Sequence, residues 1–456
     1  MPAVAKKTGK RVFVVGAGPA GLTAAYQLAR KGHEVTIYEQ MPKAGGMFRY
    51  GIPEFRLPKK ILQGEIDDIV SMGVKIVTSF KVGRDATLAD LRSKCDAMIV
   101  ANGAWLSSPM GIPGENSKRV VGGIDFLREL PRLEGAVAIV GGGNTAMDAC
   151  RMALRRGAKK SYVLYRRTRA EMPAEAAEIA EAEEEGVELK FLRNPAEIVE
   201  TESGLKVKLQ VMELGPVDAK GRRRPIPVVG KFEELEVSTL VMAIGQRADE
   251  RGFEALPMDG VEVCGDASAK GAGYAIQAIA DANEAVEKIS AYLAKEPYVA
   301  KPITVSERVL SKEDFLEYER KPRTDGPRNA GEAKREAKRC LECGCHDYRD
   351  CRLIRLVEEN RIDVKRLKGE KHPAFVERSL GAIERNQAKC ITCGMCVRIC
   401  EEVAKKGLLG LVGRGFKTVI KPEFKGKAAI AGCVDCGLCV EYCPTGALKR
   451  LKKDGE

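Results

Sequence analysis

The chain has 456 residues, of which 44% are hydrophobic, 31% charged and 5% aromatic, and its formal net charge is +12. At roughly 150 residues per domain, this length predicts about three domains, each able to bury a hydrophobic core. Because aromatic residues are few and the basic residues are dispersed, the positive charge does not predict nucleic-acid binding.

The cysteines are concentrated at one end of the sequence. Twelve of the 15 follow residue 339, and the others are Cys95, Cys150 and Cys264. No hydrophobic signal core follows the basic N-terminus MPAVAKKTGKR, and no apolar run approaches the roughly 18 residues needed for a transmembrane segment. We therefore expect a cytoplasmic protein, in which clustered cysteines bind metal more often than they form disulfides.

A strand, a glycine turn, a helix and a second strand are predicted for RVFVVGAGPAGLTAAYQLARKGHEVTIYE. The glycines form a G-x-G-x-x-G motif, which permits a tight turn and a close approach of the backbone to a pyrophosphate at the helix N-terminus. Glu39 ends the second strand, where an acid accepts a hydrogen bond from a ribose hydroxyl. The predicted dinucleotide-binding residues are Glu39 and the turn residues Gly16, Gly18, Pro19, Ala20 and Gly21.

The same pattern recurs in AVAIVGGGNTAMDACRMALRRGAKKSYVLYRRTR, with a G-x-G-x-x-A turn. Its second strand ends in two arginines, whose guanidinium groups pair with a 2′-phosphate that an acid would repel. This favours NADP(H) over NAD(H), and the alternative is that both arginines are solvated surface residues. The predicted binding residues are Gly141, Gly143, Asn144, Thr145, Ala146, Arg166 and Arg167.

The chain then returns to the first domain. TLVMAIGQ predicts a strand that leaves the inserted fold, and VEVCGDASAKGAGYAIQAIADANEAVEKI predicts a short strand and a helix on either side of Gly265 and Asp266. Asp266 could accept a hydrogen bond from a flavin ribityl hydroxyl, although an aspartate in a plain turn would look the same. Two dinucleotide folds in one chain suggest a flavin and a nicotinamide.

Residues 10 to 295 resemble the small subunit of NADPH-dependent glutamate synthase and its flavoprotein relatives. The motifs that carry this resemblance are VGAGPAGL, GGMFRYGIPEFRLP, GIPGE, GGGNTAMD, YRRTRAEMP, GRRRPIPVVG, MAIGQ and GDA. The resemblance implies FAD in the N-terminal fold and NADPH in the inserted fold with both arginines. It places these further residues along the FAD: Gly46, Val82, Gly103, Gly265 and Asp266.

Disulfide reductases of this architecture have a redox-active C-x-x-C beside the flavin. Here Cys95, Cys150 and Cys264 are isolated in apolar or small-residue surroundings, which favours a packing role. Electrons that reach the flavin therefore need another exit.

Three sets of four cysteines follow a charged connector. The last two sets have C-x2-C-x2-C-x3-C spacing, typical of two-cluster ferredoxins, in which the fourth cysteine of a run ligates the other cluster. We predict two [4Fe-4S] clusters, with zinc as the alternative because C-x2-C pairs also build zinc ribbons. The three sets are Cys340, Cys343, Cys345 and Cys351; Cys390, Cys393, Cys396 and Cys400; and Cys433, Cys436, Cys439 and Cys443.

The last two sets resemble the ferredoxin-like segments of iron-only hydrogenases and of the large peripheral iron–sulfur subunit of respiratory complex I. The first set, in EAKRCLECGC, resembles the cysteine segment that opens the glutamate synthase small subunit. A third cluster is therefore expected. Its ligands are most simply the four cysteines, but His346 could replace one of them, and its nuclearity stays open.

The expected fold is α/β, with two Rossmann-like domains of the glutathione-reductase type and a C-terminal ferredoxin-like iron–sulfur domain. The expected segments are 1–125 and 249–295 for FAD, 126–248 for NADPH, 296–338 as linker, and 339–456 for the clusters. Electrons would pass between NADPH, FAD and the clusters in either direction, with no side chain needed as a general base.

No terminal active-site motif is present, so the expected partners are a hydrogenase, dehydrogenase or diaphorase-like subunit, or ferredoxin, within a larger complex. Whether the flavin bifurcates electrons stays open. The alternatives are a glutamate synthase small subunit, a self-sufficient NADPH:ferredoxin reductase and a non-catalytic wiring subunit.

Overall fold

The computed structural model describes residues 4–217, 221–268, 271, 273–300, 324, 326, 329–338, 356–357, 359–360, 362, 375–380, 383–422 and 436–451. The chain divides into two compact units, Met1–Tyr298 and Val299–Glu456. Among the described residues, no helix is long and apolar enough to cross a membrane.

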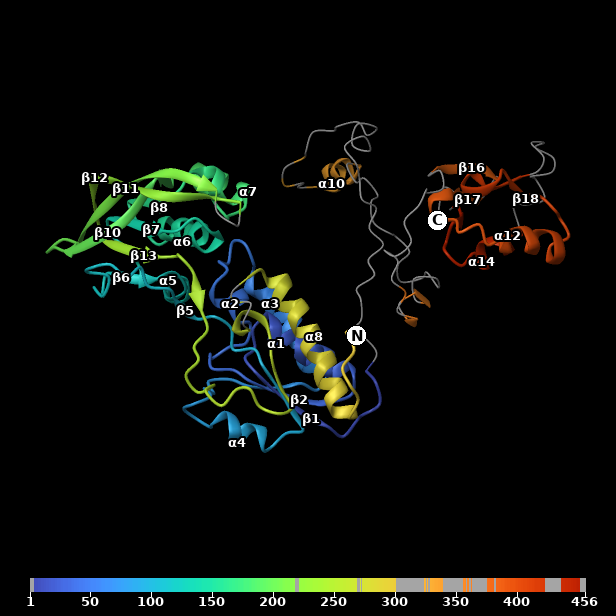
Figure 1. Ribbon diagram of the computed structural model, residues 1–456, viewed down its shortest axis with the longest axis horizontal. Helices are drawn as coiled ribbons and strands as arrows, with labels where there is room; N and C mark the ends of the chain where they lie inside the picture. The colour runs from blue at the N-terminus through green and yellow to red at the C-terminus, as the bar shows by residue number, and fades with distance from the viewer. Residues whose placement is uncertain are drawn as a thin grey trace. The chain divides into compact units, whose positions relative to one another are not determined.

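The first unit begins with a parallel five-stranded sheet in the order β15-β4-β1-β2-β3. Val12 and Val14 of β1 pack under α1 and α8, which lie side by side (Figure 1). Phe13 and Val15 face the opposite layer with α4. The elements are β1 (Arg11–Val15), α1 (Pro19–Arg30), β2 (Glu34–Tyr38), α2 (Met47–Tyr50), α3 (Lys59–Ser71), β3 (Lys75–Val77), α4 (Leu88–Arg92), β4 (Ala97–Val100), β15 (Val261–Val263), the short helix η2 (Gly265–Ala267) and α8 (Ala275–Ala294).

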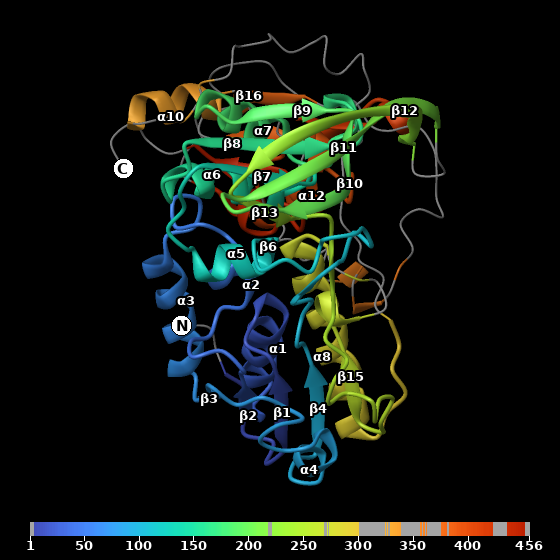
Figure 2. The ribbon, with the colours of Figure 1, turned by 90° about the vertical axis from the view of Figure 1, so that its left-hand side faces the viewer.

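A second parallel sheet has the order β6-β13-β7-β8-β9. Helices α5, α6 and α7 cover one of its faces, and an antiparallel sheet of β10, β11 and β12 packs on the other (Figure 2). The elements are β6 (Val120–Gly122), α5 (Gly123–Glu129), β7 (Ala136–Val140), α6 (Asn144–Arg155), β8 (Lys160–Tyr165), η1 (Arg169–Glu171), α7 (Ala176–Glu184), β9 (Glu188–Phe191), β10 (Arg193–Glu200), β11 (Leu205–Val217), β12 (Arg223–Val237) and β13 (Thr239–Met242).

The chain passes between the two parallel sheets twice, and the two connecting segments form a pair of strands. Strand β5 (Leu106–Ser107) leads out of the first sheet and β14 (Gln246–Arg247) leads back, in an antiparallel ribbon. The second sheet begins at β6, before the boundary expected between residues 125 and 126. The three residues of β6 include a glycine and lie in a glycine-rich stretch, so their sequence resembles a loop.

Among its described residues, the second unit repeats one local arrangement, in which a cysteine and then a glycine precede a short helix. Gly394 and Gly437 take φ values of +73° and +63° before α12 and α14, where a residue with a Cβ would be strained. Cysteines of both runs lie in one buried core. The elements are α10 (Ala330–Ala337), β16 (Val376–Leu380), β17 (Ile383–Asn386), η3 (Gln387–Lys389), α12 (Met395–Arg398), η4 (Ile399–Val403), β18 (Leu409–Val412), η5 (Gly415–Lys417), β19 (Val419–Pro422), α14 (Leu438–Glu441) and β20 (Leu448–Arg450).

Candidate cofactor-binding sites

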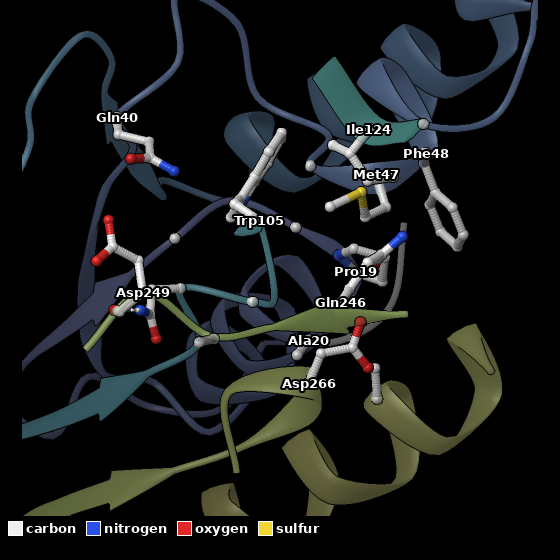
Figure 3. Close-up of a pocket in the computed structure, with 18 of the residues that line it drawn as sticks. Pro19, Ala20, Gln40, Met47, Phe48, Trp105, Ile124, Gln246, Asp249 and Asp266 are labelled. Carbon is white, nitrogen blue, oxygen red and sulfur yellow. Dashed lines mark hydrogen bonds between the residues drawn. The ribbon is translucent and has the colours of Figure 1, made fainter. Parts of the chain in front are cut away.

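A first cleft, with a cavity of about 360 Å³, lies at the carboxyl ends of the first sheet's strands. In Figure 3, Trp105 lies between polar Gln40 and Asp249 on one side and apolar Met47 and Ile124 on the other. An apolar wall with a few polar groups is typical of a cofactor site. Nine residues expected to contact FAD line this cleft: Gly16, Gly18, Pro19, Ala20, Glu39, Gly46, Val82, Gly103 and Asp266.

The remaining two residues expected to contact FAD, Gly21 and Gly265, do not line the cleft but pack against residues that do. A Cβ at Gly21 would lie 1.8 Å from the Gly16 carbonyl oxygen, so this glycine lets α1 pack on the turn. Gly265 is buried against Ala20. On the cleft wall, Gly46 has φ +51°, and a Cβ there would lie 2.5 Å from Gly18 Cα. Bare backbone from two segments therefore meets at the N-terminus of α1.

Glu39 is buried at the end of β2, with 3% of its surface exposed. Its Oε2 accepts a hydrogen bond from the Ala17 N–H at 2.6 Å, and its Oε1 accepts one from the Met41 N–H at 2.7 Å. Burial raises the pKa of this carboxyl, against these backbone hydrogen bonds. Each oxygen keeps acceptor capacity, so the side chain fits the expected contact with a ribose hydroxyl.

Asp266 lies in the short helix η2 after β15, close to the N-terminus of α8. Figure 3 shows its carboxylate beside Ala20, on the floor of the first cleft. Its Oδ1 accepts a hydrogen bond from the Gly273 N–H at 3.0 Å. Burial raises the pKa of Asp266. The aspartate is therefore both a turn residue and part of the cleft wall.

Cys264 also lines the first cleft. It is 1% exposed, and burial raises the pKa of its thiol to about 12. Within the described ranges, no second cysteine lines this cleft. The described part of the site therefore offers no pair of thiols for disulfide chemistry.

A second cleft, with a cavity of about 660 Å³, lies at the carboxyl ends of the second sheet's strands. Ala146 of α6, expected here, is instead fully buried on the face of the helix that packs on the sheet, where a small residue allows close packing. The other expected residues line the cleft: Gly141, Gly143, Asn144, Thr145, Arg166 and Arg167.

The two arginines after β8 differ. Arg166 is exposed, whereas Arg167 is 7% exposed and donates a hydrogen bond from Nε to the Arg223 carbonyl oxygen at 2.7 Å. Arg222 lines the same cleft and was not singled out in the sequence, although the run GRRRP was. The cleft therefore has three basic side chains, one of which also anchors β12.

The two clefts adjoin each other. Six residues line both: Ile124, Asn144, Thr145, Gln246, Gly273 and Tyr274. Transfer between two bound cofactors needs their reacting atoms near contact distance. Because the clefts share these residues, ligands bound in them could bring their reacting atoms near contact distance.

An ion-pair network joins the two dinucleotide domains beside the first cleft. Arg56, between α2 and α3, lies 2.8 Å from Asp148 on α6 and 3.0 Å from Glu178 on α7. Burial raises the pKa of Asp148 to about 6, although Arg56 acts in the opposite direction. Sequence reasoning missed this pair because its members are 92 residues apart and belong to different sheets.

A small cavity of about 20 Å³ in the second unit is lined by cysteines from both C-terminal runs. The first three of one run, Cys390, Cys393 and Cys396, meet the last of the other, Cys443. In two-cluster ferredoxins, each cluster is likewise held by three cysteines of one run and the last cysteine of the other. The Thr392 N–H donates to Cys390 Sγ at 3.4 Å, as cluster-binding loops do.

Cys400 and Cys439 lie elsewhere in the same buried core, and the Leu408 N–H donates to Cys400 Sγ at 3.3 Å. In the described part of the chain, no three Cys, His, Asp or Glu side chains form a site for a single metal ion. The four cysteines of the grouping line the small cavity together with Arg385. The other expected ligands lie outside the described residues: Cys340, Cys343, Cys345, Cys351, Cys433 and the alternative His346.

These features define an oxidoreductase with two dinucleotide folds and an iron–sulfur tail. Residues 10–267 match the family described as pyridine nucleotide-disulphide oxidoreductase, and residues 389–447 match the 4Fe-4S dicluster domain. The chain belongs to the pyridine nucleotide-disulphide oxidoreductase family and carries a 4Fe-4S dicluster domain. Both parts of the expected fold class are confirmed.

Two relatives and one solved structure show the range of similarity. The NADP(+)-dependent formate dehydrogenase subunit beta of Moorella thermoacetica is 45% identical over 313 residues, covering 63% of this chain and 44% of that one. The NADPH glutamate synthase small chain of Azospirillum brasilense is 34% identical over 325 residues, covering 63% and 67%. This confirms the resemblance to that subunit.

Mycobacterium tuberculosis FprA in complex with NADPH has a similar fold, with a TM-score of 0.56 at 19% identity. The match covers 63% of this chain and 85% of FprA. By contrast, the chain spans less than half the length of the formate dehydrogenase subunit.

Proposed function

We propose that the chain is an NADPH-dependent oxidoreductase subunit that passes electrons between NADPH, FAD and [4Fe-4S] clusters and a redox partner. The observation that carries this proposal is the adjoining pair of clefts, because the six residues that line both would let a nicotinamide meet a flavin. When bound, FAD would exchange hydride with the nicotinamide and single electrons with the clusters.

The first cleft would hold FAD. The N-terminus of α1 would take the pyrophosphate, because its unpaired N–H groups and helix dipole favour an anion, and the absence of a side chain at Gly46 lets its backbone lie against Gly18 there. Glu39 would accept a hydrogen bond from a ribose hydroxyl, and Asp266 one from the ribityl chain. The second cleft would hold NADPH, with Arg166 and Arg167 on its 2′-phosphate.

Three cubanes would occupy the second unit. The first would be held by Cys390, Cys393, Cys396 and Cys443, in keeping with the cavity that these side chains line. By the crossing pattern of two-cluster ferredoxins, the second would be held by Cys400, Cys433, Cys436 and Cys439. The third would be held by the upstream set Cys340, Cys343, Cys345 and Cys351.

The partner would be another redox protein of the cytoplasm, either a dehydrogenase, hydrogenase or diaphorase-like subunit or a ferredoxin. A relative that is 45% identical bears the name of a formate dehydrogenase subunit. A relay of one flavin and three clusters is longer than reduction of a small diffusible acceptor requires, which supports a docked partner. The +12 net charge should make that docking sensitive to salt.

The test is anaerobic reduction of the purified full chain by NADPH, followed by flavin absorbance and by electron paramagnetic resonance (EPR) of the clusters. We expect one FAD and about twelve iron atoms per chain, with the flavin reduced first and the clusters after it. Reduced flavin beside oxidised clusters would contradict the relay. Zinc in place of iron would contradict the tail assignment.

A further inference from the structure

Arg385 of β17 is the most deeply buried charged side chain described in the second unit, with 2% of its surface exposed. Its guanidinium lies 5.7 Å from the centre of the Phe375 ring, and its Nη2 donates to the Glu377 carboxylate. These contacts fix one end of the guanidinium. They leave its other N–H groups to be satisfied elsewhere.

Two atoms of that guanidinium, Nε and Nη1, are buried and have no hydrogen-bond partner among the described residues. A buried donor without a partner is costly, and more so when the group is charged. Native structures therefore rarely leave one without a missing water, ion or ligand to explain it.

The same side chain lines the cysteine cavity together with Cys390, Cys393, Cys396 and Cys443. Its positive charge interacts electrostatically with Cys390 and Cys396. Arg385 therefore brings a fixed positive charge and unpaired donors to the place where the proposed ligands meet.

We propose that Arg385 donates hydrogen bonds to sulfur atoms of the cubane held by Cys390, Cys393, Cys396 and Cys443 and raises the reduction potential of that cubane. This role rests on the ligand set proposed above. Sulfides and thiolates of a cubane are anionic acceptors, and they would complete the hydrogen bonding of Nε and Nη1.

The direction of the shift follows from charge. A four-thiolate cubane carries about −2 when oxidised, and uptake of one electron adds one negative charge. A nearby buried cation stabilises the more negative, reduced state to a greater extent. Hydrogen bonds to the sulfurs act in the same direction.

The experiment is an anaerobic redox titration of the full cluster-loaded chain with dithionite, monitored by EPR, comparing the wild type with Arg385→Met. Methionine keeps a long side chain but removes the charge and the donors. We expect the equilibrium constant for one-electron reduction of one cluster to fall about tenfold, which is ~59 mV in midpoint potential. The other midpoints should stay unchanged.

Arg398→Met is the matched control, because Arg398 lies between two cysteines of the same run but its side chain is 68% exposed. Solvent screens its charge, so its removal should leave all midpoints unchanged. Arg385→Lys keeps the charge and should give an intermediate shift. If Arg385→Met leaves every midpoint in place, or Arg398→Met shifts one equally, the proposal is wrong.

A measurement on the wild type covers the case in which Arg385→Met does not load its clusters. Chain labelled with ¹⁵N in the arginine guanidinium groups should show ¹⁵N hyperfine coupling to one reduced cluster. Absence of that coupling would overturn the role of Arg385 alone, since the clusters are present. A wild-type chain without iron would overturn the ligand set and the role together.

Discussion

The guanidinium of Arg56 lies 2.8 Å from the Asp148 carboxylate, so an ion pair connects the loop after α2 to helix α6 of the second sheet. The Asp148 side chain is 6% exposed and that of Arg56 26% exposed. Burial disfavours the charged form of Asp148 more than Arg56 favours it, so the pKa of this carboxyl is raised, and Arg56 also pairs with Glu178. Protonation of Asp148 removes its negative charge without changing the sequence.

The first prediction concerns this carboxyl. Burial raises the pKa of this carboxyl from its ordinary value of 3.8 to about 6 in the folded chain, so the native state binds more protons than the unfolded state between these values. Stability from this group therefore falls as the pH rises through that range. Relative to Asp148→Asn, the free energy of unfolding of the wild type should fall by about 2 kcal/mol between roughly pH 4 and pH 6.

The measurement is the temperature at which flavin is released on heating, detected by its fluorescence, for the wild type and Asp148→Asn across this pH range. The exposed Asp67→Asn on α3 serves as the control and should follow the wild type. Parallel pH profiles for the wild type and Asp148→Asn would show that Asp148 does not titrate in this range.

The second prediction concerns the choice of nicotinamide. Arg166→Ala should weaken NADPH binding by about 1 to 3 kcal/mol and leave NADH binding nearly unchanged, because only NADPH carries the 2′-phosphate. With Arg167→Ala added, the loss should reach about 2 to 4 kcal/mol. Titration calorimetry measures both affinities.

Arg167 also anchors β12 through the Arg223 carbonyl, so the single variant at Arg166 is the sharper probe. Arg169→Ala is the matched control, since Arg169 follows on the same loop, pairs with Glu183 and does not line the cleft. Equal affinities of the wild type for NADH and NADPH would overturn the assignment.

The third prediction concerns Gly46 on the wall of the first cleft. Gly46→Ala places a Cβ 2.5 Å from Gly18 Cα at a φ of +51°, so one of two backbone segments must move. The variant should be purified largely without FAD, as measured by the flavin-to-protein absorbance ratio. Gly64→Ala, in helix α3 with nothing within 4 Å, should retain FAD and gain up to about 1 kcal/mol of stability.

The fourth prediction concerns the grouping of the cysteines. Cys390→Ser and Cys443→Ser should each remove the same cluster, so each variant and their combination should lose about four iron atoms. Cys400→Ser should remove a different one, and Cys95→Ser, at a buried site in the first unit, should remove none. Additive iron losses for Cys390→Ser and Cys443→Ser would mean that they ligate separate clusters.

The sequence predicted the features that are encoded locally. The glycine turns at Gly16 and Gly141 are each read from a strand, a turn and a helix within about 30 residues, and their steric demands are specific. The cysteine spacing likewise predicts ligand sharing. The fold class and the membership of a flavoprotein family followed from these motifs.

The features that were missed arise only from tertiary contacts. Arg56 and Asp148 meet because the two dinucleotide domains pack against each other. Arg222 precedes β12 and lines the second cleft, although it is far in sequence from the glycine turn at Gly141 that lines the same cleft. Arg385 carries no local signal, because a single arginine in a strand is ordinarily a surface residue. Spacing in the sequence does not predict which charges become buried together.

The antiparallel pairing of β5 with β14 sets Leu106 opposite Arg247, so the entry and exit of residues 108–245 lie next to each other. An inserted domain whose two ends are adjacent can be replaced by another without distorting the domain that carries it. Replacing this segment with one that prefers another nicotinamide should leave the flavin sheet intact. Preference for the electron donor could thus be inherited separately from the flavin and the iron–sulfur tail.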